Sequence, residues 1–131
     1  MIKAVLDTNV LVSALWTPAG NPSTIVSLIL VDKIIPCFSQ SILNEYRAVL
    51  SRPKLMFLSG QVDRLLYEIA IRGLMVTVSP GLIQLPDEAD RKFYDVAKYC
   101  DAFLVTGNTR HFPKEHKILN PAKFLKLHEF I

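Results

Sequence analysis

Short apolar runs alternate with amphipathic segments along the whole chain. Each run ends at turn residues or charges, a pattern typical of buried strands. We predict strands at residues 2–6, 34–38, 74–78 and 102–106, with a shorter fifth at 116–119.

Between these runs, apolar residues recur at helical spacing. The first such segment follows the first strand from Val10 to Leu15, and Ser39 is a suitable N-cap for a helix after the second strand. The further predicted helices cover 23–32, 40–50, 61–71, a segment from Asp87 or Glu88 to Tyr99, and a terminal segment that begins at Pro121.

Short strands that alternate with helices predict parallel βαβ units, whose sheet is covered on both faces. We therefore expect an α/β fold with a central, mainly parallel sheet of four to five strands. Because no linker or repeat interrupts the chain, we expect a single domain over residues 1–131.

Polar residues collect where the predicted strands end. They are Asp7 after the first strand, and Thr106, Gly107 and Asn108 after the fourth strand. Asp87, Glu88 and Asp90 lie at the start of the helix that precedes the fourth strand. Sites in parallel α/β folds lie outside the carboxyl ends of the strands, so we expect these groups to lie together. Asp7 also has a structural interpretation, because aspartate is a good helix cap.

Glu45 lies inside the predicted 40–50 helix, beside its apolar face, and is either a site residue or an ordinary solvated glutamate. Three carboxylates from three segments would repel one another unless a cation lay between them. All-oxygen ligands favour Mg²⁺ or Mn²⁺ over Zn²⁺. Since such a site accepts phosphate oxygens, the pattern favours phosphodiester chemistry.

Composition narrows the class of protein. Hydrophobic residues make up 50% of the chain and charged residues 21%, which suits a compact fold. The longest apolar stretch stops at Asp32, too early to span a bilayer, and no secretory signal is evident, so we expect a cytoplasmic protein without a membrane partner. Cys37 and Cys100 are predicted to be free buried thiols rather than a disulfide. The net charge of +3 is compatible with a nucleic-acid partner.

Three stretches, in this order, resemble those of the PIN-domain family, and within it the VapC-type toxins of toxin–antitoxin pairs. They are VLDTNVLVSAL, SQSILNEYRAVLSRPKL and DEADRKFYDVAKYCDAFLVTGN, and together they span nearly the whole chain. The resemblance implies a three-layer α/β sandwich around a parallel sheet. It also implies a ribonuclease that depends on Mg²⁺ or Mn²⁺ and is inhibited by a small antitoxin protein.

The resemblance also assigns roles to single residues. Asp7, Glu45 and Asp90 match the first three acids of the family, which implies that they are the metal ligands. Thr8 and Asn9 match small polar positions beside the first acid. Thr106 matches a hydroxyl found next to the site.

This chain departs from the family at the fourth acid. Many relatives read TGD where this chain reads TGN, and Asn108 offers only a neutral ligand or a group that orients water. Some relatives instead carry an acid three residues later, where this chain has His111. Asp87 is a nearby substitute.

Basic residues that flank these segments are candidates for holding RNA phosphates, although each is also explained as a solvated surface charge. They are Arg47, Arg52, Arg91, Lys92 and Arg110. Trp16 is interpreted either as a base-stacking residue or as part of the core or a dimer contact. The apolar segments 23–32 and 125–131 suggest a homo-oligomer, a dimer or larger, although core packing explains them equally well.

The implied reaction is hydrolysis of RNA by in-line attack of a water that an acid or Asn108 orients, without a covalent intermediate. The alternative is a catalytically weak PIN-fold protein that binds RNA or a protein partner. A nucleotide-binding doubly wound domain ranks last, because the chain has neither a GxGxxG motif nor a P-loop.

Overall fold

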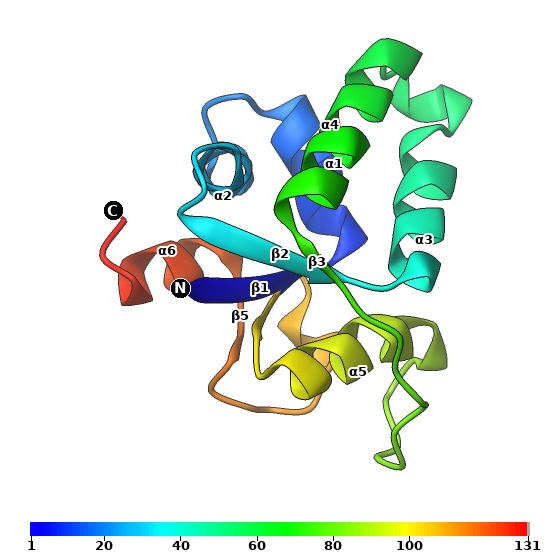
Figure 1. Ribbon diagram of the computed structural model, residues 1–131, viewed down its shortest axis with the longest axis vertical. Coiled ribbons are helices and arrows are strands. Elements are labelled where there is room, and N and C mark those ends of the chain that lie inside the picture. The colour runs from blue at the N-terminus through cyan, green and yellow to red at the C-terminus, as the bar shows by residue number, and fades with distance from the viewer. Residues whose placement is uncertain (131) are drawn as a thin grey trace.

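Five parallel strands form the centre of the structure, a computed structural model that describes residues 1–130 (Figure 1). The strand order is β3-β2-β1-β4-β5, and every neighbouring pair is parallel. The strands are β1 (Ile2–Leu6), β2 (Ile34–Phe38), β3 (Leu74–Met75), β4 (Phe103–Val105) and β5 (Ile118–Leu119).

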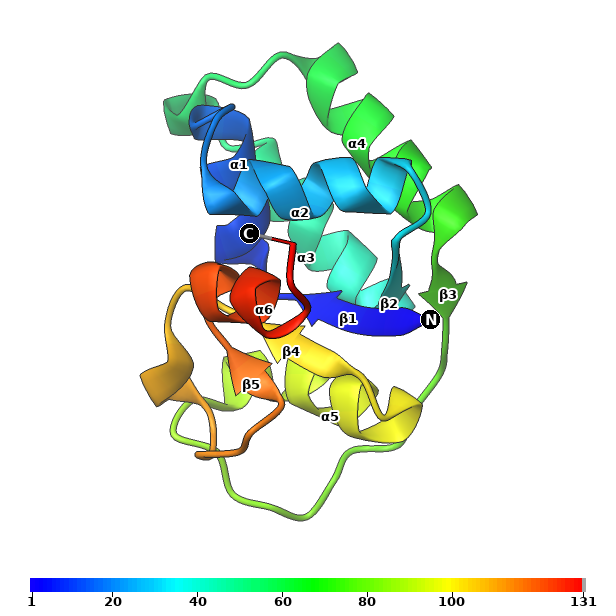
Figure 2. The ribbon, with the colours of Figure 1, turned by 90° about the vertical axis from the view of Figure 1, so that its left-hand side faces the viewer.

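Helices cover both faces of this sheet. The helices are α1 (Thr8–Trp16), α2 (Asn21–Leu30), α3 (Gln40–Leu50), α4 (Ser59–Arg72), α5 (Arg91–Cys100) and α6 (Pro121–Leu127), with 3₁₀ turns η1 (Pro53–Leu55), η2 (Glu88–Asp90) and η3 (Thr109–His111). Helices α1 to α4 lie on one side of the sheet and α5 on the other, while α6 packs beside α2 (Figures 1 and 2). The predicted three-layer α/β fold is therefore confirmed.

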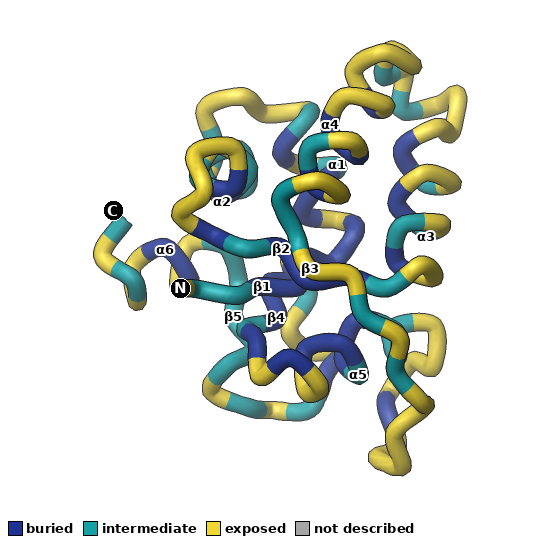
Figure 3. The backbone as a smooth tube through the Cα atoms, viewed as in Figure 1, coloured by how far each residue is buried: buried dark blue, intermediate teal, exposed yellow. Residues whose placement is uncertain are grey.

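β1 is the central strand of the sheet, and Asp7 directly follows its last residue, so the position of β1 fixes the position of Asp7. Ala4 pairs with Pro36 of β2 on one side and with Phe103 of β4 on the other. The last three residues of β1 are all but fully buried, as the dark centre of Figure 3 shows. Asp7 leaves this strand at the carboxyl edge of the sheet.

The bounds of several elements differ from the predicted ones for local reasons. β3 is shorter than the predicted 74–78 strand because it has only β2 as a neighbour, and its ladder stops where Val76 N donates to Phe38 O at the end of β2. α2 begins at Asn21 rather than at 23, since Pro22 fits the first helical turn, and it ends before Asp32, whose φ is 61°. The helix predicted from Asp87 or Glu88 divides into η2 and α5.

The structure also tests the predictions about buried residues and membrane spans. Cys37 and Cys100 are both buried and free, as predicted. Trp16 is 58% exposed, so its interpretation as a core residue is wrong. None of the helices within residues 1–130 is long and apolar enough to cross a membrane. Ile131, the end of the apolar 125–131 segment, lies outside the described residues.

Gly73 ends α4 where the backbone passes close to β2. A Cβ added there would lie 2.7 Å from both Ile69 O and Phe38 Cε1, and also against Pro36 O. We expect Gly73→Ala to lower the free energy of unfolding by about 1–3 kcal/mol, because backbone atoms cannot move aside easily.

Gly60 supplies the matched control for Gly73. It lies in the first turn of α4, and a Cβ there would meet nothing within 4 Å. Gly60→Ala should raise the free energy of unfolding by about 0.4–1 kcal/mol, because it restricts the unfolded chain. Urea denaturation of both variants measures the two effects, and equal effects would contradict the close approach at Gly73.

Candidate functional site

Asp7 is held at the carboxyl edge of the sheet between β1 and β4. It is only 7% exposed, and Thr106 at the end of β4 donates its hydroxyl to Asp7 Oδ2 at 2.8 Å. Asp7 occupies the N-cap position of α1, yet its side chain makes no capping hydrogen bond. Its carboxylate therefore bonds to Thr106 at the end of β4 and not to the start of α1, so capping of the helix is not its main role.

Asn9 and Thr106 join the start of α1 to the turn after β4. Asn9 Oδ1 accepts from Gly107 N at 3.0 Å, and Asn9 Nδ2 lies 3.4 Å from Asp7 Oδ2. Thr106 Oγ1 accepts from Asn108 N at 3.0 Å. These bonds orient Asp7 and bring Asn108 to the same edge.

Glu45 faces the start of α1 from α3. Thr8 Oγ1 donates to Glu45 Oε2 at 2.5 Å, and Lys92 Nζ donates to Glu45 Oε1 at 2.8 Å. α3 is anchored here because the buried Tyr46 donates its hydroxyl to Leu6 O at 2.5 Å. Two specific partners for one carboxylate contradict the interpretation of Glu45 as an ordinary solvated glutamate.

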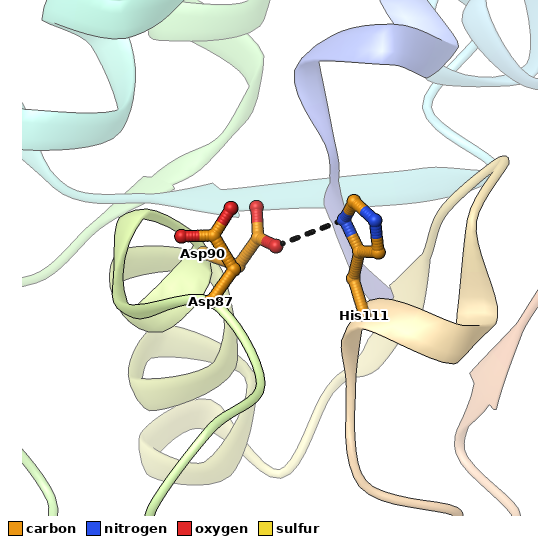
Figure 4. Close-up of side chains that lie close together, drawn as sticks. All are labelled: Asp87, Asp90 and His111. Atoms are coloured by element: carbon orange, nitrogen blue, oxygen red, sulfur yellow. Dashed lines mark ion pairs between the residues drawn. The ribbon is translucent and has the colours of Figure 1, made fainter.

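Asp90 is the last residue of η2 and the N-cap of α5, opposite the η3 turn. Its Oδ2 is buried and accepts no hydrogen bond from the described residues, although His111 Nδ1 lies 3.3 Å away (Figure 4). Ligand atoms of Asp87, Asp90 and His111 all lie within 4.8 Å of one another. Asp87 also accepts from Ala89 N and so caps η2.

The acids at this edge interact electrostatically. Burial raises the pKa of Asp7 above its ordinary value, the Thr106 hydroxyl opposes this, and the charges of Asp90 and Glu45 raise it further. Burial also raises the pKa of Asp90, with help from the charges of Asp87 and Glu45 and against the effect of His111. The predicted acids therefore lie close enough for the charges of Glu45 and Asp90 to affect the Asp7 carboxyl group, and for those of Asp87 and Glu45 to affect Asp90.

This set of side chains fits a hard divalent cation. Asp7, Glu45 and Asp90 offer carboxylate oxygens, which suit Mg²⁺ or Mn²⁺. Within residues 1–130 these three acids do not form a group whose ligand atoms all lie within 4.8 Å, whereas Asp87, Asp90 and His111 do. The buried Asp90 Oδ2, which lacks a hydrogen-bond donor among residues 1–130, is a suitable ligand atom. His111 would add a nitrogen to Asp87 and Asp90, and such a mixed set favours Mn²⁺ over Mg²⁺.

The basic residues predicted to bind RNA have different surroundings. Arg91 donates to Glu88 Oε2 at 2.6 Å and to the carbonyl oxygens of Gly81 and Ile83, so its guanidinium ties down the loop before η2. Arg47 is paired with Asp63 at 2.7 Å. Within residues 1–130, Arg52 and Arg110 make no ion pair.

Two contacts of the site could not be inferred from the sequence. The ion pair between Lys92 and Glu45 joins α5 to α3, and the contact between His111 and Asp90 joins η3 to η2. The only sequence signal was position. Lys92 lies two residues after Asp90, and His111 three residues after Asn108.

Lys92 would compete with any cation that bound the Glu45 carboxylate, because it already pairs with Glu45 Oε1. Both side chains are about a quarter exposed, and such a pair is worth about 0.2–1 kcal/mol. We therefore expect Lys92→Gln to lower the Mg²⁺ or Mn²⁺ concentration needed for half-maximal thermal stabilisation, by up to about fivefold. Lys98→Gln is the control, because Lys98 is on the same helix but pairs with Glu115. Weaker metal binding in Lys92→Gln would contradict the competition.

Comparison with known proteins adds a family match. A family model described as a PIN domain matches residues 3–110, a range that contains Asp7, Glu45, Asp90 and Asn108. One relative is the uncharacterized protein MJ1680 of Methanocaldococcus jannaschii. It is 38% identical over 110 residues, which cover 82% of this chain and 71% of that protein. No solved structure matches the chain.

Proposed function

This chain belongs to the PIN domain family, and we propose that it is an endoribonuclease that uses Mg²⁺ or Mn²⁺. PIN domains are in general metal-dependent nucleases. The strongest support from the site is that Asp7, Glu45 and Asp90, which come from three separate elements, lie close enough for their charges to interact. The buried Asp90 Oδ2, which accepts no hydrogen bond among residues 1–130, adds to this support.

In the proposed mechanism, water attacks the phosphorus of RNA in line with the leaving oxygen. Asp7, Glu45 and Asp90 would hold the cation. A bound Mg²⁺ or Mn²⁺ lowers the pKa of a coordinated water and neutralises charge on the phosphate oxygens. Thr106 and Thr8 fix the directions of the Asp7 and Glu45 carboxylates.

Asn108 is proposed to orient the attacking water. Its amide Nδ2 lies 2.8 Å from His111 Nε2, and the other ring nitrogen of His111 faces Asp90. If Nδ2 donates to Nε2, the ring proton lies on Nδ1, which is 3.3 Å from Asp90 Oδ2 but makes no hydrogen bond to it. The carbonyl oxygen of Asn108 then remains as an acceptor for water. His111 in this way links the neutral Asn108 to an acid.

We also propose that the whole of residues 1–131 forms a single domain and that the protein acts in the cytoplasm as the toxin of a toxin–antitoxin pair.

Exposed apolar side chains support a protein partner, whether a small antitoxin or a second copy in a homo-oligomer. Trp16 contacts Phe57, and the neighbouring Met56 and Leu58 are 85% and 75% exposed.

A second candidate is a PIN-fold protein that binds RNA or a protein partner with little catalysis. Two observations favour it. Asn108 contributes no charge, and Lys92 neutralises part of the Glu45 carboxylate. A binding protein of this kind would hold RNA equally well with and without divalent cations.

Cleavage assays separate the two candidates. Purified protein, shown to be folded and free of any antitoxin, is incubated with a mixed RNA pool and with matched DNA in EDTA, Mg²⁺ or Mn²⁺. The nuclease proposal predicts internal cutting of RNA only with Mg²⁺ or Mn²⁺. Absence of cutting in every condition would contradict it and favour the binding protein.

A further inference from the structure

We propose that a pocket beside the acids, between η3, β5 and α6, binds the RNA nucleotide next to the scissile phosphate. This inference rests on the proposed function, because it names how the same site holds its substrate. The pocket has a volume of about 420 Å³, within the usual size of small-molecule sites. Its walls include Thr109, Arg110, Phe112, Lys114, Asn120 and Lys123.

The pocket adjoins the acid cluster through the η3 turn. Arg110 lines the pocket, while its neighbour His111 faces Asp90 at 3.3 Å. β5 runs parallel to β4, so its carboxyl end at Leu119 and Asn120 opens at the same sheet edge as Thr106. Figure 2 shows β5, α6 and the segment between β4 and β5 together on this flank of the molecule. The acids and the pocket therefore share one edge of the sheet, so that a strand held at the acids can extend into the pocket.

The charges of the pocket suit a phosphodiester strand. Arg110, Lys114 and Lys123 are exposed, and none of them makes an ion pair within residues 1–130. Glu115, the acid in the lining, is already engaged, because Tyr94 donates to it at 2.6 Å and Lys98 at 2.8 Å. The pocket thus presents three basic side chains that make no ion pair within residues 1–130. Arg47, Arg91 and Lys92, in contrast, are all paired with acids.

The floor of the pocket is apolar. Phe112 is buried, and Pro113, Ile118 and Leu119 are partly buried beside it. Such a floor suits the face of a base or ribose, which single-stranded nucleic acid offers whatever its sequence. Cations around an apolar floor match a nucleotide better than they match an isolated anion.

The test compares two triple variants that change the net charge equally. Arg110→Gln, Lys114→Gln and Lys123→Gln are combined in one protein. Lys33→Gln, Lys54→Gln and Arg64→Gln are combined in another, because these residues are exposed and lie outside the pocket. Binding of a fluorescein-labelled single-stranded RNA is measured by anisotropy in EDTA, so that no cleavage occurs, at several salt concentrations. Thermal unfolding checks that both variants fold.

The pocket variant should bind RNA on the order of 10-fold more weakly than wild type, and its dependence of log K on log salt should be shallower by about two. The control variant should lose clearly less. Equal losses in the two variants, or wild-type affinity in the pocket variant, would overturn the subsite. Absence of measurable binding by wild type would overturn it too. None of these results decides the nuclease proposal, which depends on cleavage with Mg²⁺ or Mn²⁺.

Discussion

Replacing Asp7 with Asn is expected to reduce metal-dependent RNA cleavage at least about 100-fold. Loss of a group that merely supports a metal ligand costs about 10- to 100-fold, and Asp7 is proposed to be a ligand itself. The substitution keeps the shape of the side chain, and Asn can still accept the hydrogen bond from Thr106. Initial rates with the same RNA in Mg²⁺ or Mn²⁺ measure the loss.

The same variant should be more stable than wild type in EDTA. Burial raises the pKa of Asp7 in the folded protein. A carboxyl group of this kind favours folding while it is protonated, at a pH below its unfolded pKa of about 3.9, and this contribution is lost as the pH rises through the folded pKa. Asp7→Asn should therefore raise the melting temperature at pH 7, by an amount that shrinks toward pH 4.

Metal addition should reverse this order of stability. Mg²⁺ or Mn²⁺ should raise the melting temperature of wild type, because a ligand that binds the folded state stabilises it, and should leave Asp7→Asn nearly unchanged. If Asp7→Asn melted below wild type at pH 7 in EDTA, this would contradict the claim that the buried charge of Asp7 destabilises the folded protein. Equal cleavage rates would contradict its role as a ligand.

Replacing Phe93 with Ala is expected to lower the free energy of unfolding by about 3–5 kcal/mol. Phe93 is fully buried on the inner face of α5, and its ring centroid lies 6.4 Å from that of Tyr46. The cavity would form under the helix that follows Asp90 and carries Lys92. Since a domain of this size has a total stability of about 5–15 kcal/mol, this is a large part of the free energy of unfolding.

Urea denaturation measures this effect, and Tyr99→Ala on the same helix is the matched control. Tyr99 is 67% exposed, so its removal should cost less than about 1 kcal/mol. Comparable losses in the two variants would show that α5 does not pack through Phe93.

Elements with strong local signals could be predicted from the sequence. β2 and α3 have their predicted bounds, because Ser39 accepts from Ile42 N as an N-cap and α3 ends at Leu50, just before Arg52 and Pro53. The same parallel topology accounts for the expected gathering of Asp7 and Thr106 at one edge. Hydrophobic period and turn residues are local properties, so they can be read from the chain.

Contacts between distant elements could not be predicted in this way. Lys92 and Arg91 are adjacent basic residues, yet one pairs with Glu45 across the site and the other holds the loop at Gly81. The helix face decides this difference, and it depends on how α5 packs. The length of β3 likewise depends on its place at the sheet edge, which its own sequence does not specify.

The most direct test of the proposed nuclease site is the Mg²⁺ and Mn²⁺ dependence of RNA cleavage by wild type, Asp90→Asn and Asp101→Asn. Asp90 and Asp101 flank opposite ends of α5, and Asp101 has φ of 51°, a conformation that Asn accepts well. Wild type and Asp101→Asn should show the same saturable increase with metal, and Asp90→Asn should show almost none. Equal cleavage by all three proteins, or cleavage by wild type in EDTA, would contradict a metal-dependent nuclease site at these acids.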